Sequence, residues 1–159
     1  MLRRATGVVA LIVAAATLAG AAAAPQAAAP ATPSPAPFVK KLVTQMVRDD
    51  YARAWLTLYP VHKRVAARWE YLYCELKTPI PGDIQSLDVV RVTNGRFFVA
   101  GAGRIQGKAV TFRLVLRGLG TIEHTSHVVR VHGGWRWILT PDRYRLYRTD
   151  GCGGNGLSA

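Results

Sequence analysis

Histidine is the side chain in this sequence best suited to bind a metal ion, and three histidines fall within one predicted strand, residues 124–132. His124 and His132 share one face of a regular strand, but eight residues separate them. At about 3.3 Å per residue they are roughly 26 Å apart, which is too far for one ion. No carboxylate completes a ligand set. The sequence also lacks a Gly-x-Ser-x-Gly nucleophile segment and a glycine loop before a helix. We therefore expect no metal and no cofactor.

The chain has two cysteines, Cys74 and Cys152. In an exported protein an even number of cysteines indicates a disulfide, and two cysteines allow only one pairing. The bond closes a loop of nearly eighty residues, for which the chain-entropy model gives a stabilisation of roughly 4–4.5 kcal/mol. The alternative is a pair of free thiols.

The chain carries a formal net charge of +12, and arginine is its most frequent charged residue. Six arginines fall at polar positions of the predicted strands, opposite the inferred core face: Arg91, Arg104, Arg113, Arg117, Arg130 and Arg136. The apolar residues interleaved with them are Phe98, Val115, Val128 and Ile138. Such a face could bind an anionic envelope polymer or an anionic lipid surface. The simpler alternative is a solvated outer face. We expect no specific nucleic acid as a partner.

The elements that position these side chains begin with helices. Apolar residues recur every three or four positions over 38–59, which predicts one long amphipathic helix. Pro60 ends it, since proline cannot donate to the preceding turn. One or two short helices are expected over 60–75 and another over 140–147. The predicted apolar stripe of the segment 60–75 comprises Val61, Val65, Trp69, and Leu72 or Tyr73.

From residue 84 the apolar pattern has a period of two, which predicts strands. The predicted strands are 84–93, 96–105, 108–117, 124–132 and 135–139. Asn94-Gly95 and Gln106-Gly107 are expected as turns between the first three, and Gly101 with Gly103 predicts a bulge or sharp curve. Helices followed by hairpins indicate an α+β fold: a long N-terminal helix plus short helices packed on a curved antiparallel sheet of four to five strands.

The N-terminus has the order of a secretory signal, with Arg3 and Arg4, an apolar run over 7–20, and small residues before a cut after Ala23. A retained anchor is the alternative. We expect a secreted or extracytoplasmic protein of the cell envelope. The expected organisation is a cleavable signal peptide at 1–23, a Pro/Ala-rich spacer at 24–37, one domain at 38–152 and a flexible tail at 153–159.

Four segments carry a family resemblance: Tyr51–His62 (YARAWLTLYPVH), Tyr71–Cys74 (YLYC), Gly134–Trp137 (GWRW) and Asp150–Cys152 (DGC). With the order of helices before strands, they resemble exported bacterial members of the nuclear-transport-factor-2-like superfamily, also called SnoaL-like or the cystatin-like cone. The resemblance covers roughly residues 38–152. It implies the fold more than the activity, because the superfamily contains isomerases, cyclases, dehydratases and many non-enzymatic modules.

The resemblance implies a cup between helix and sheet, into which an Asp, His or Tyr reaches in the enzymatic members. The weak catalytic candidates here are Asp88 and His127. Asp88 could act as a general base if burial raised its pKa, and its alternative is a solvated strand residue. The cup would be lined by Tyr51, Trp55, Tyr59, Phe112, Trp135 and Trp137. Members of this superfamily often pair through the sheet, so the arginine-rich face could instead be the surface of a homodimer.

We expect a small exported module of the cell envelope that binds or assembles rather than catalyses. One alternative is a cofactor-free isomerase or cyclase with one acid/base residue in the cone pocket. Another is binding of a polyanion or an anionic membrane through the arginine-rich sheet face. The sequence names no ligand.

Overall fold

The computed structural model of this 159-residue chain describes residues 33–149 and Cys152. The expected signal peptide, the first part of the expected spacer and the expected tail lie outside the described residues. The elements in chain order are α1 (Ala36–Val47), α2 (Tyr51–Leu56), α3 (Pro60–Lys63), α4 (Arg68–Lys77), β1 (Ile84–Val99), β2 (Gly103–Leu116), β3 (Gly120–Val131), β4 (Gly134–Trp137) and α5 (Pro141–Thr149).

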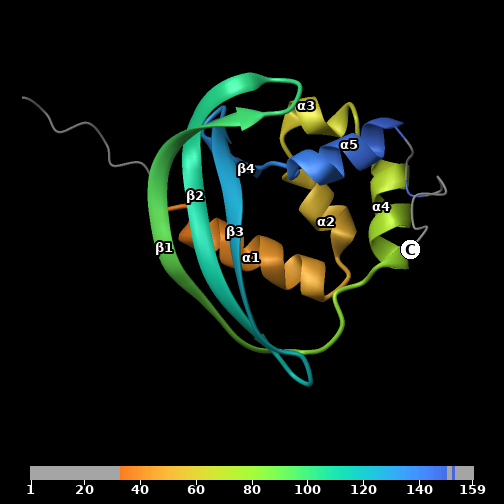
Figure 1. Ribbon diagram of the computed structural model, residues 1–159, viewed down its shortest axis with the longest axis vertical. Helices are drawn as coiled ribbons and strands as arrows, with labels where there is room; N and C mark the ends of the chain where they lie inside the picture. Colours follow the sequence, from red (N-terminus) through yellow and green to blue (C-terminus); the bar gives the residue numbers. More distant parts are fainter. Residues whose placement is uncertain (1–32, 150–151, 153–159) are drawn as a thin grey trace, which may run out of the picture. The chain divides into compact units, whose positions relative to one another are not determined.

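The four strands form one antiparallel sheet in the order β1-β2-β3-β4, so that each strand pairs with its neighbour in the sequence. Figure 1 shows that β1 and β2 are long and strongly bent, with helices packed against the sheet. This architecture confirms the predicted α+β fold with a curved antiparallel sheet.

The single long helix predicted over 38–59 is wrong, because the chain breaks between α1 and α2. Asp49 adopts the left-handed backbone conformation, with φ of 56°. The Asp50 carboxylate then accepts a hydrogen bond from the backbone N–H of Arg53 at 3.4 Å and caps α2. Two consecutive aspartates therefore end one helix and start the next, although the apolar period continues across them.

The turns predicted at Asn94-Gly95 and Gln106-Gly107 are also wrong, because β1 and β2 run through both sites. Asn94 pairs with Lys108, and Gly95 pairs with Gly107 across the hairpin. A Cβ atom at Gly107 would lie 2.5 Å from the Val128 carbonyl oxygen and would clash with the Phe97 ring. Gly107 therefore serves close packing rather than a turn.

The true turn of this hairpin follows Val99, at Gly101 and Gly103, for which the sequence predicted a bulge or sharp curve. Gly101 and Gly103 have φ of 74° and 78°, and the N–H of Ala102 donates to the carbonyl of Val99 at 2.9 Å. The register irregularities lie elsewhere, between Ile84 and Ser86 and between Val89 and Arg91.

The main core lies between the helices and one face of the sheet. As the alternation of β2 predicts, this face presents Val110, Phe112, Leu114 and Leu116. Trp137 of β4 connects both layers, since its indole N–H donates to the carbonyl of Ala54 at 2.8 Å. Its backbone N–H also donates to the carbonyl of Thr57 at 3.2 Å.

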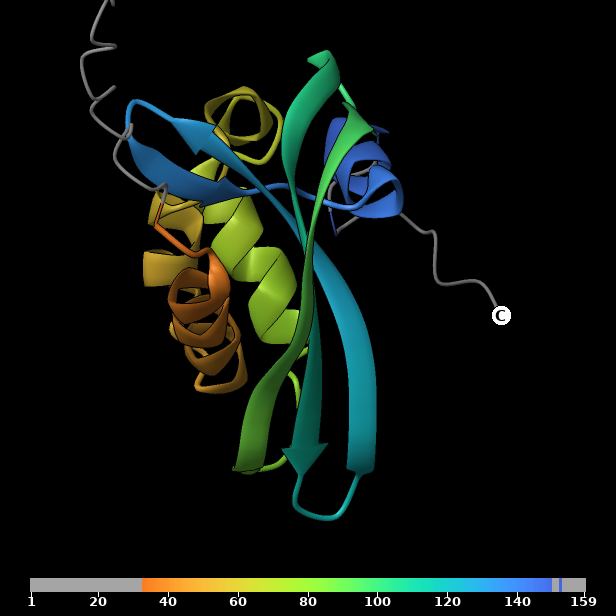
Figure 2. The ribbon, with the colours of Figure 1, turned by 90° about the vertical axis from the view of Figure 1, so that its left-hand side faces the viewer.

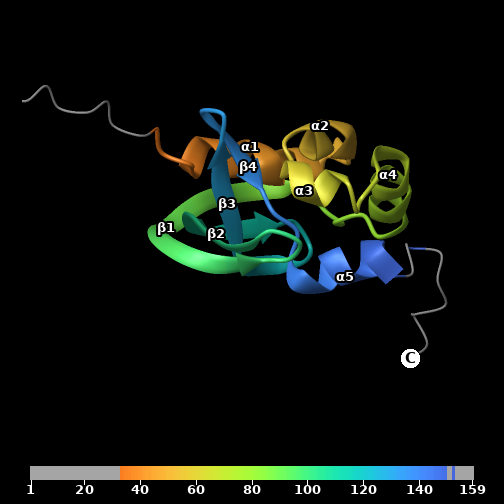
Figure 3. The same ribbon diagram turned by 90° about the horizontal axis from the view of Figure 1, so that it is seen from above.

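Along the β1–β2 hairpin the covered side of the sheet changes. Figures 2 and 3 show α5 on the opposite side of this hairpin from α1. Near the turn, the buried positions are Val99 and Gly107. Gly107 is three residues from Val110 along β2, and Val99 pairs with Gly103, which is seven residues from Val110. Because side chains alternate between the two faces of a strand, both positions lie on the face opposite to Val110. The face that carries Val110 is thus covered in mid-strand and open near the turn.

His62 of α3 fixes the hairpin turn to the rest of the domain. Its side chain is fully buried. The Nδ1 atom accepts a hydrogen bond from the backbone N–H of Leu139 at 2.9 Å, and the Nε2 atom lies 3.1 Å from the carbonyl oxygen of Ala100. Since a backbone N–H can only donate, Nδ1 is unprotonated and Nε2 carries the proton. The histidine is therefore a structural clamp in its neutral form.

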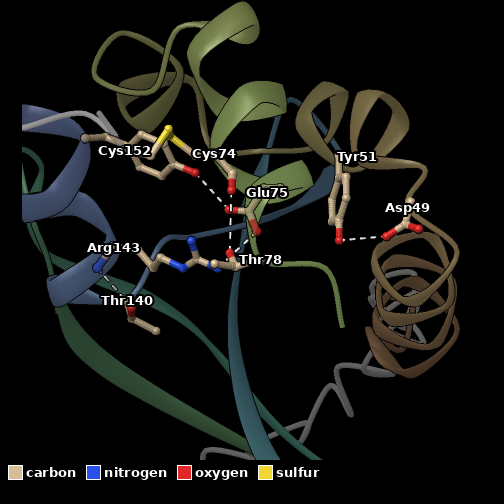
Figure 4. Close-up of polar contacts among 9 residues, drawn as sticks. Asp49, Tyr51, Cys74, Glu75, Thr78, Thr140, Arg143 and Cys152 are labelled. Atoms are coloured by element: carbon tan, nitrogen blue, oxygen red, sulfur yellow. Dashed lines mark hydrogen bonds and ion pairs between the residues drawn. A yellow bond between two sulfur atoms is a disulfide. The ribbon is translucent and has the colours of Figure 1, made fainter. Parts of the chain in front are cut away.

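The expected disulfide between Cys74 and Cys152 is present, with the two Cα atoms 5.1 Å apart. Figure 4 shows it beside Glu75, on the inward side of α4. This inward side consists of Tyr71, Cys74 and Glu75. The predicted apolar stripe of this segment is wrong for Trp69, which is exposed. Of the alternatives Leu72 and Tyr73, Leu72 packs against the core and Tyr73 is exposed.

Candidate functional site

Most of the β1–β2 hairpin lies in a basic stretch of the chain that has no acidic residue. Residues 89–122 contain no Asp or Glu. Their cations are Arg91, Arg96, Arg104, Lys108, Arg113 and Arg117. Among the ion pairs of the described residues, Arg113 is the only one of these to take part, with Glu123 at 3.5 Å. The positive charge of the hairpin is therefore largely uncompensated.

Strand register brings three of these cations to one face near the turn. Arg96 pairs with Gln106, Phe98 pairs with Arg104, and Asn94 pairs with Lys108. Positions two residues apart on a strand share a face, and directly paired residues share it too. We call the set Arg96, Phe98, Arg104 and Lys108 the basic hairpin face.

This face is open to solvent. Arg96 and Arg104 are exposed, and Phe98 exposes 67% of its surface. Arg104 and Lys108 are four residues apart, about 13 Å along the strand, and Arg96 lies across from the position between them. The Lys108 amine is in hydrogen-bond contact with the side-chain oxygen of Asn94. The result is a triangle of cations beside an exposed aromatic ring, within reach of one extended polymer.

The expectation that six arginines share one face is corrected by the register. Arg113 pairs with Asp88, Arg91 with Thr111 and Arg136 with Val129, on the side opposite to the main core. Arg104 and Arg130 instead have the parity of the core residues Val110 and Val128. Because β2 runs straight through Gln106-Gly107, no turn resets the alternation, and Arg104 keeps the side of Val110. Arg117 lies just beyond the end of β2.

Asp88 and His127, the two catalytic candidates, lie apart on the sheet. The Asp88 side chain is 72% exposed and forms an ion pair with Lys40 at 3.6 Å. Along β2, Asp88 is paired with Arg113 and His127 with Ala109, so about four residues separate their positions. The His127 ring lies 4.7 Å from the Phe97 ring. Desolvation, and secondarily the charge of His124, lowers the pKa of His127.

Five of the six aromatic residues expected to line a cup pack into or against the core. Tyr51, Phe112 and Trp137 are buried, and Trp55 and Trp135 are partly buried against the core. Tyr59 contacts His62 edge-on at 5.6 Å between ring centres. A groove of about 310 Å³ lies elsewhere, between α1 and α2, and is lined by Phe38, Lys41, Leu42, Gln45, Arg53, Leu56 and Thr57.

The indole N–H groups are also bonded internally. Trp55 donates to the carbonyl of Ala66 at 2.9 Å, and Trp135 donates to the carbonyl of Pro33 at 3.2 Å. The Trp137 indole donates to Ala54, as described above. Hydrogen bonds to backbone carbonyl groups therefore fix the orientation of these three rings.

A buried polar cluster surrounds Glu75, and sequence reasoning missed it. Tyr147 donates its hydroxyl to Glu75 Oε1 at 2.8 Å, and Arg143 Nη2 donates to Glu75 Oε2 at 3.0 Å (Figure 4). Burial, together with the negative charge of Glu75, raises the pKa values of Tyr147 and Tyr71. The signal was the spacing of Tyr71, Cys74 and Glu75, which share one side of a helix at intervals of three and four.

Tyr51 belongs to a second polar contact at the break between α1 and α2. Its hydroxyl donates to the Asp49 carboxylate at 2.9 Å (Figure 4). Burial, and then the hydrogen bond to Asp49, raises the pKa of Tyr51 to about 12. The ring itself is in the core, so this contact orders the helix break.

Within residues 33–149 and Cys152, no group of three or more His, Cys, Asp or Glu side chains is placed to hold a metal ion. None of the helices described above is long and apolar enough to span a bilayer. No family model, no curated protein and no solved structure matches the chain. The arguments for function therefore depend on the geometry of the domain itself.

Proposed function

We propose that this protein is an exported, non-catalytic module of the cell envelope that binds an anionic polymer through the basic hairpin face. The observation that carries the proposal is the set of three cations on one open face, within residues 89–122, which contain no acidic residue. Guanidinium groups bind phosphate, sulfate and carboxylate groups with paired hydrogen bonds. Phe98 adds apolar contact area beside them.

The energetics of such a face come mainly from counterion release. An anionic polymer holds condensed cations, and each protein cation that replaces one of them makes binding more sensitive to salt. Binding through this face is expected to be weakly selective for the polymer's chemistry, because the face has charge and stacking area but no deep pocket among the described residues.

Two further observations favour binding over catalysis. The aromatic residues that would line a catalytic cup pack internally, and the carboxylate of Asp88 is solvated and paired with Lys40. A general base of this kind normally lies in a desolvated site. The Asp88 side chain is exposed to solvent instead.

The cellular location and the family are part of the same proposal. A disulfide between Cys74 and Cys152 supports an oxidising compartment outside the cytoplasm, in agreement with the signal-like residues 1–23. Helices that precede a curved antiparallel sheet support membership of the nuclear-transport-factor-2-like superfamily.

The proposal is tested by the salt dependence of binding to heparin, used as a generic sulfated polymer. The triple variant Arg96→Gln, Arg104→Gln, Lys108→Gln removes the three cations of the face. Each contact contributes about 0.7–0.9 to the slope of log affinity against log salt. The variant should therefore lose roughly two units of that slope and elute at clearly lower salt.

The matched control is Lys41→Gln, Arg48→Gln, Arg148→Gln, which removes three exposed cations far from the hairpin in sequence and lowers the net charge equally. Lys41 is in α1, Arg48 is the residue that follows α1, and Arg148 is in α5. Its slope should stay close to that of the parent chain. Equal losses in the two triple variants would mean that heparin senses only net charge, and the proposed face would be wrong.

A further inference from the structure

Helix α4 has large apolar side chains on its outward side. Trp69, Tyr73 and Leu76 expose 73%, 51% and 60% of their surfaces. They recur at intervals of four and three residues and therefore form one stripe along the helix. We call these three residues the α4 stripe. The inward side of the same helix carries Tyr71, Cys74 and Glu75.

The fold does not account for the α4 stripe. The inward side already makes the contacts that hold α4, namely the disulfide through Cys74 and the hydrogen bonds from Tyr147 and Arg143 to Glu75. On a helix of ten residues, outward positions normally carry polar side chains. A contiguous exposed apolar patch of this kind marks a surface that contacts another protein or a membrane.

Cations border the α4 stripe. Arg68 and Lys77 stand at the two ends of α4, and the Lys77 amine lies 4.1 Å from the centre of the Tyr73 ring. Glu70 is the acidic residue on the outer part of the helix. Helix α5 lies next to α4 (Figures 1 and 3) and contacts its inward side at Glu75.

We propose that the α4 stripe docks on the surface of an anionic lipid bilayer. Trp and Tyr favour the boundary between headgroups and acyl chains, because each ring has an apolar body and a polar edge. Leu76 reaches the acyl region beside them, and the bordering Arg and Lys side chains meet anionic headgroups. The helix lies on the membrane and does not cross it.

Charge and area favour a bilayer over a second copy of the chain. The formal net charge of +12 makes two copies repel each other, whereas the same charge attracts an anionic membrane. A stable dimer usually needs about 800 Å² and 20–30 residues from each partner. Three exposed side chains on one short helix provide much less, but a bilayer accepts a small apolar wedge next to cations.

The experiment measures the depth of Trp69 in vesicles of phosphatidylglycerol and phosphatidylcholine. All variants are isolated with the same N-terminus, so that residues 1–32 contribute equally. On vesicle binding, the parent chain should show blue-shifted tryptophan emission and quenching by brominated lipids. Trp69→Phe should remove most of that response and retain binding. The triple variant Trp69→Gln, Tyr73→Gln, Leu76→Gln should lose at least tenfold in vesicle affinity at about 0.5 M salt, where electrostatic attraction is screened.

The matched control replaces three exposed apolar residues outside α4, Leu56→Gln, Leu119→Gln, Ile122→Gln, and should bind as the parent does. The heparin slope of the α4 triple variant should be unchanged, which separates this surface from the basic hairpin face. Emission from Trp69 that does not respond to vesicles, or equal losses in both triple variants, would overturn the proposal. A parent dimer that the α4 substitutions convert to monomer without lipid would assign the stripe to a second copy instead.

Discussion

At the scale of single residues, the buried carboxylate of Glu75 is the group that most needs hydrogen bonds from the protein in place of water. A buried charge is tolerated only when hydrogen bonds replace its lost hydration. Tyr147 and Arg143 supply these bonds from α5. Because Cys74 is next to Glu75, the covalent and polar attachments of the C-terminal part meet on the same turn of α4.

The Tyr147 hydroxyl can be tested on its own. Tyr147→Phe removes one donor to a buried carboxylate, and we expect the free energy of unfolding to fall by about 1.5–3 kcal/mol. Urea unfolding at constant m value measures this loss. Tyr144→Phe is the control, since Tyr144 also lies on the buried side of α5 but has no hydrogen bond from its hydroxyl in the described chain. Equal losses in both variants would contradict the role given to Glu75.

His62 makes the stability of the domain depend on pH. Burial lowers its pKa below the ordinary 6.5, against a smaller opposing effect of the hydrogen bond to Ala100. Between the folded pKa and about 6.5 the unfolded chain binds more protons, so the free energy of unfolding falls as the pH drops through this window. Below the folded pKa this contribution is already lost.

Nuclear magnetic resonance of the imidazole tests this assignment. At neutral pH, long-range ¹H–¹⁵N correlations should place the proton of His62 on Nε2, and its titration midpoint should lie below 6.5. Denaturant midpoints should decrease from pH 7 to pH 5. A proton on Nδ1, or a midpoint above 6.5, would contradict the clamp between Ala100 and Leu139.

At the scale of elements, the long β1–β2 hairpin depends on close packing at one glycine. Gly107→Ala places a methyl group against the Val128 carbonyl and the Phe97 ring, and we expect a loss of about 1–3 kcal/mol in the free energy of unfolding. Gly95→Ala is the matched control, because the nearest atom to its Cβ lies at 3.8 Å. Thermal unfolding of the two variants measures the difference. Equal losses in the free energy of unfolding would indicate a general need for glycine in the strands and would contradict the packing role of Gly107.

The hairpin also shows how far the sequence predicts this fold. The period of two predicted the strand character and the core face of 110–116 correctly, because alternation is a local property. The positions of the turns were mistaken, since Asn94-Gly95 and Gln106-Gly107 have the composition of turns. Their actual role depends on a ring and a third strand that are distant in the sequence.

The wrong turns also made the prediction of the candidate site wrong. With a turn at Gln106-Gly107, Arg104 and Val110 would belong to separate strands, and the sequence could not show that their side chains share one face of the sheet. In the structure they share one strand, and Arg104 joins Arg96 and Lys108. The opening of this face is a tertiary feature, because near the turn α5 covers the other side of the hairpin. Similarly, the outward position of Trp69 depends on which side of α4 faces the disulfide.

At the scale of the whole domain, the disulfide joins α4 to the residues that follow α5. The bond spans 78 residues, and the chain-entropy model gives about 4 kcal/mol for a loop of this length. Cys74→Ala, Cys152→Ala should therefore lower the free energy of unfolding by about that amount, as measured by urea unfolding. Reduction of the parent chain should have a similar effect. An unchanged urea midpoint after reduction would contradict a stabilising role.

The central claim is that an anionic polymer binds on the basic hairpin face. The most direct measurement is a ¹H–¹⁵N titration of the labelled chain with a short heparin oligosaccharide. We predict that the largest shift changes cluster at Arg96, Phe98, Arg104 and Lys108 and saturate together. Shift changes of equal size at the exposed cations of α1 and α5, or none at the hairpin, would contradict the proposed function.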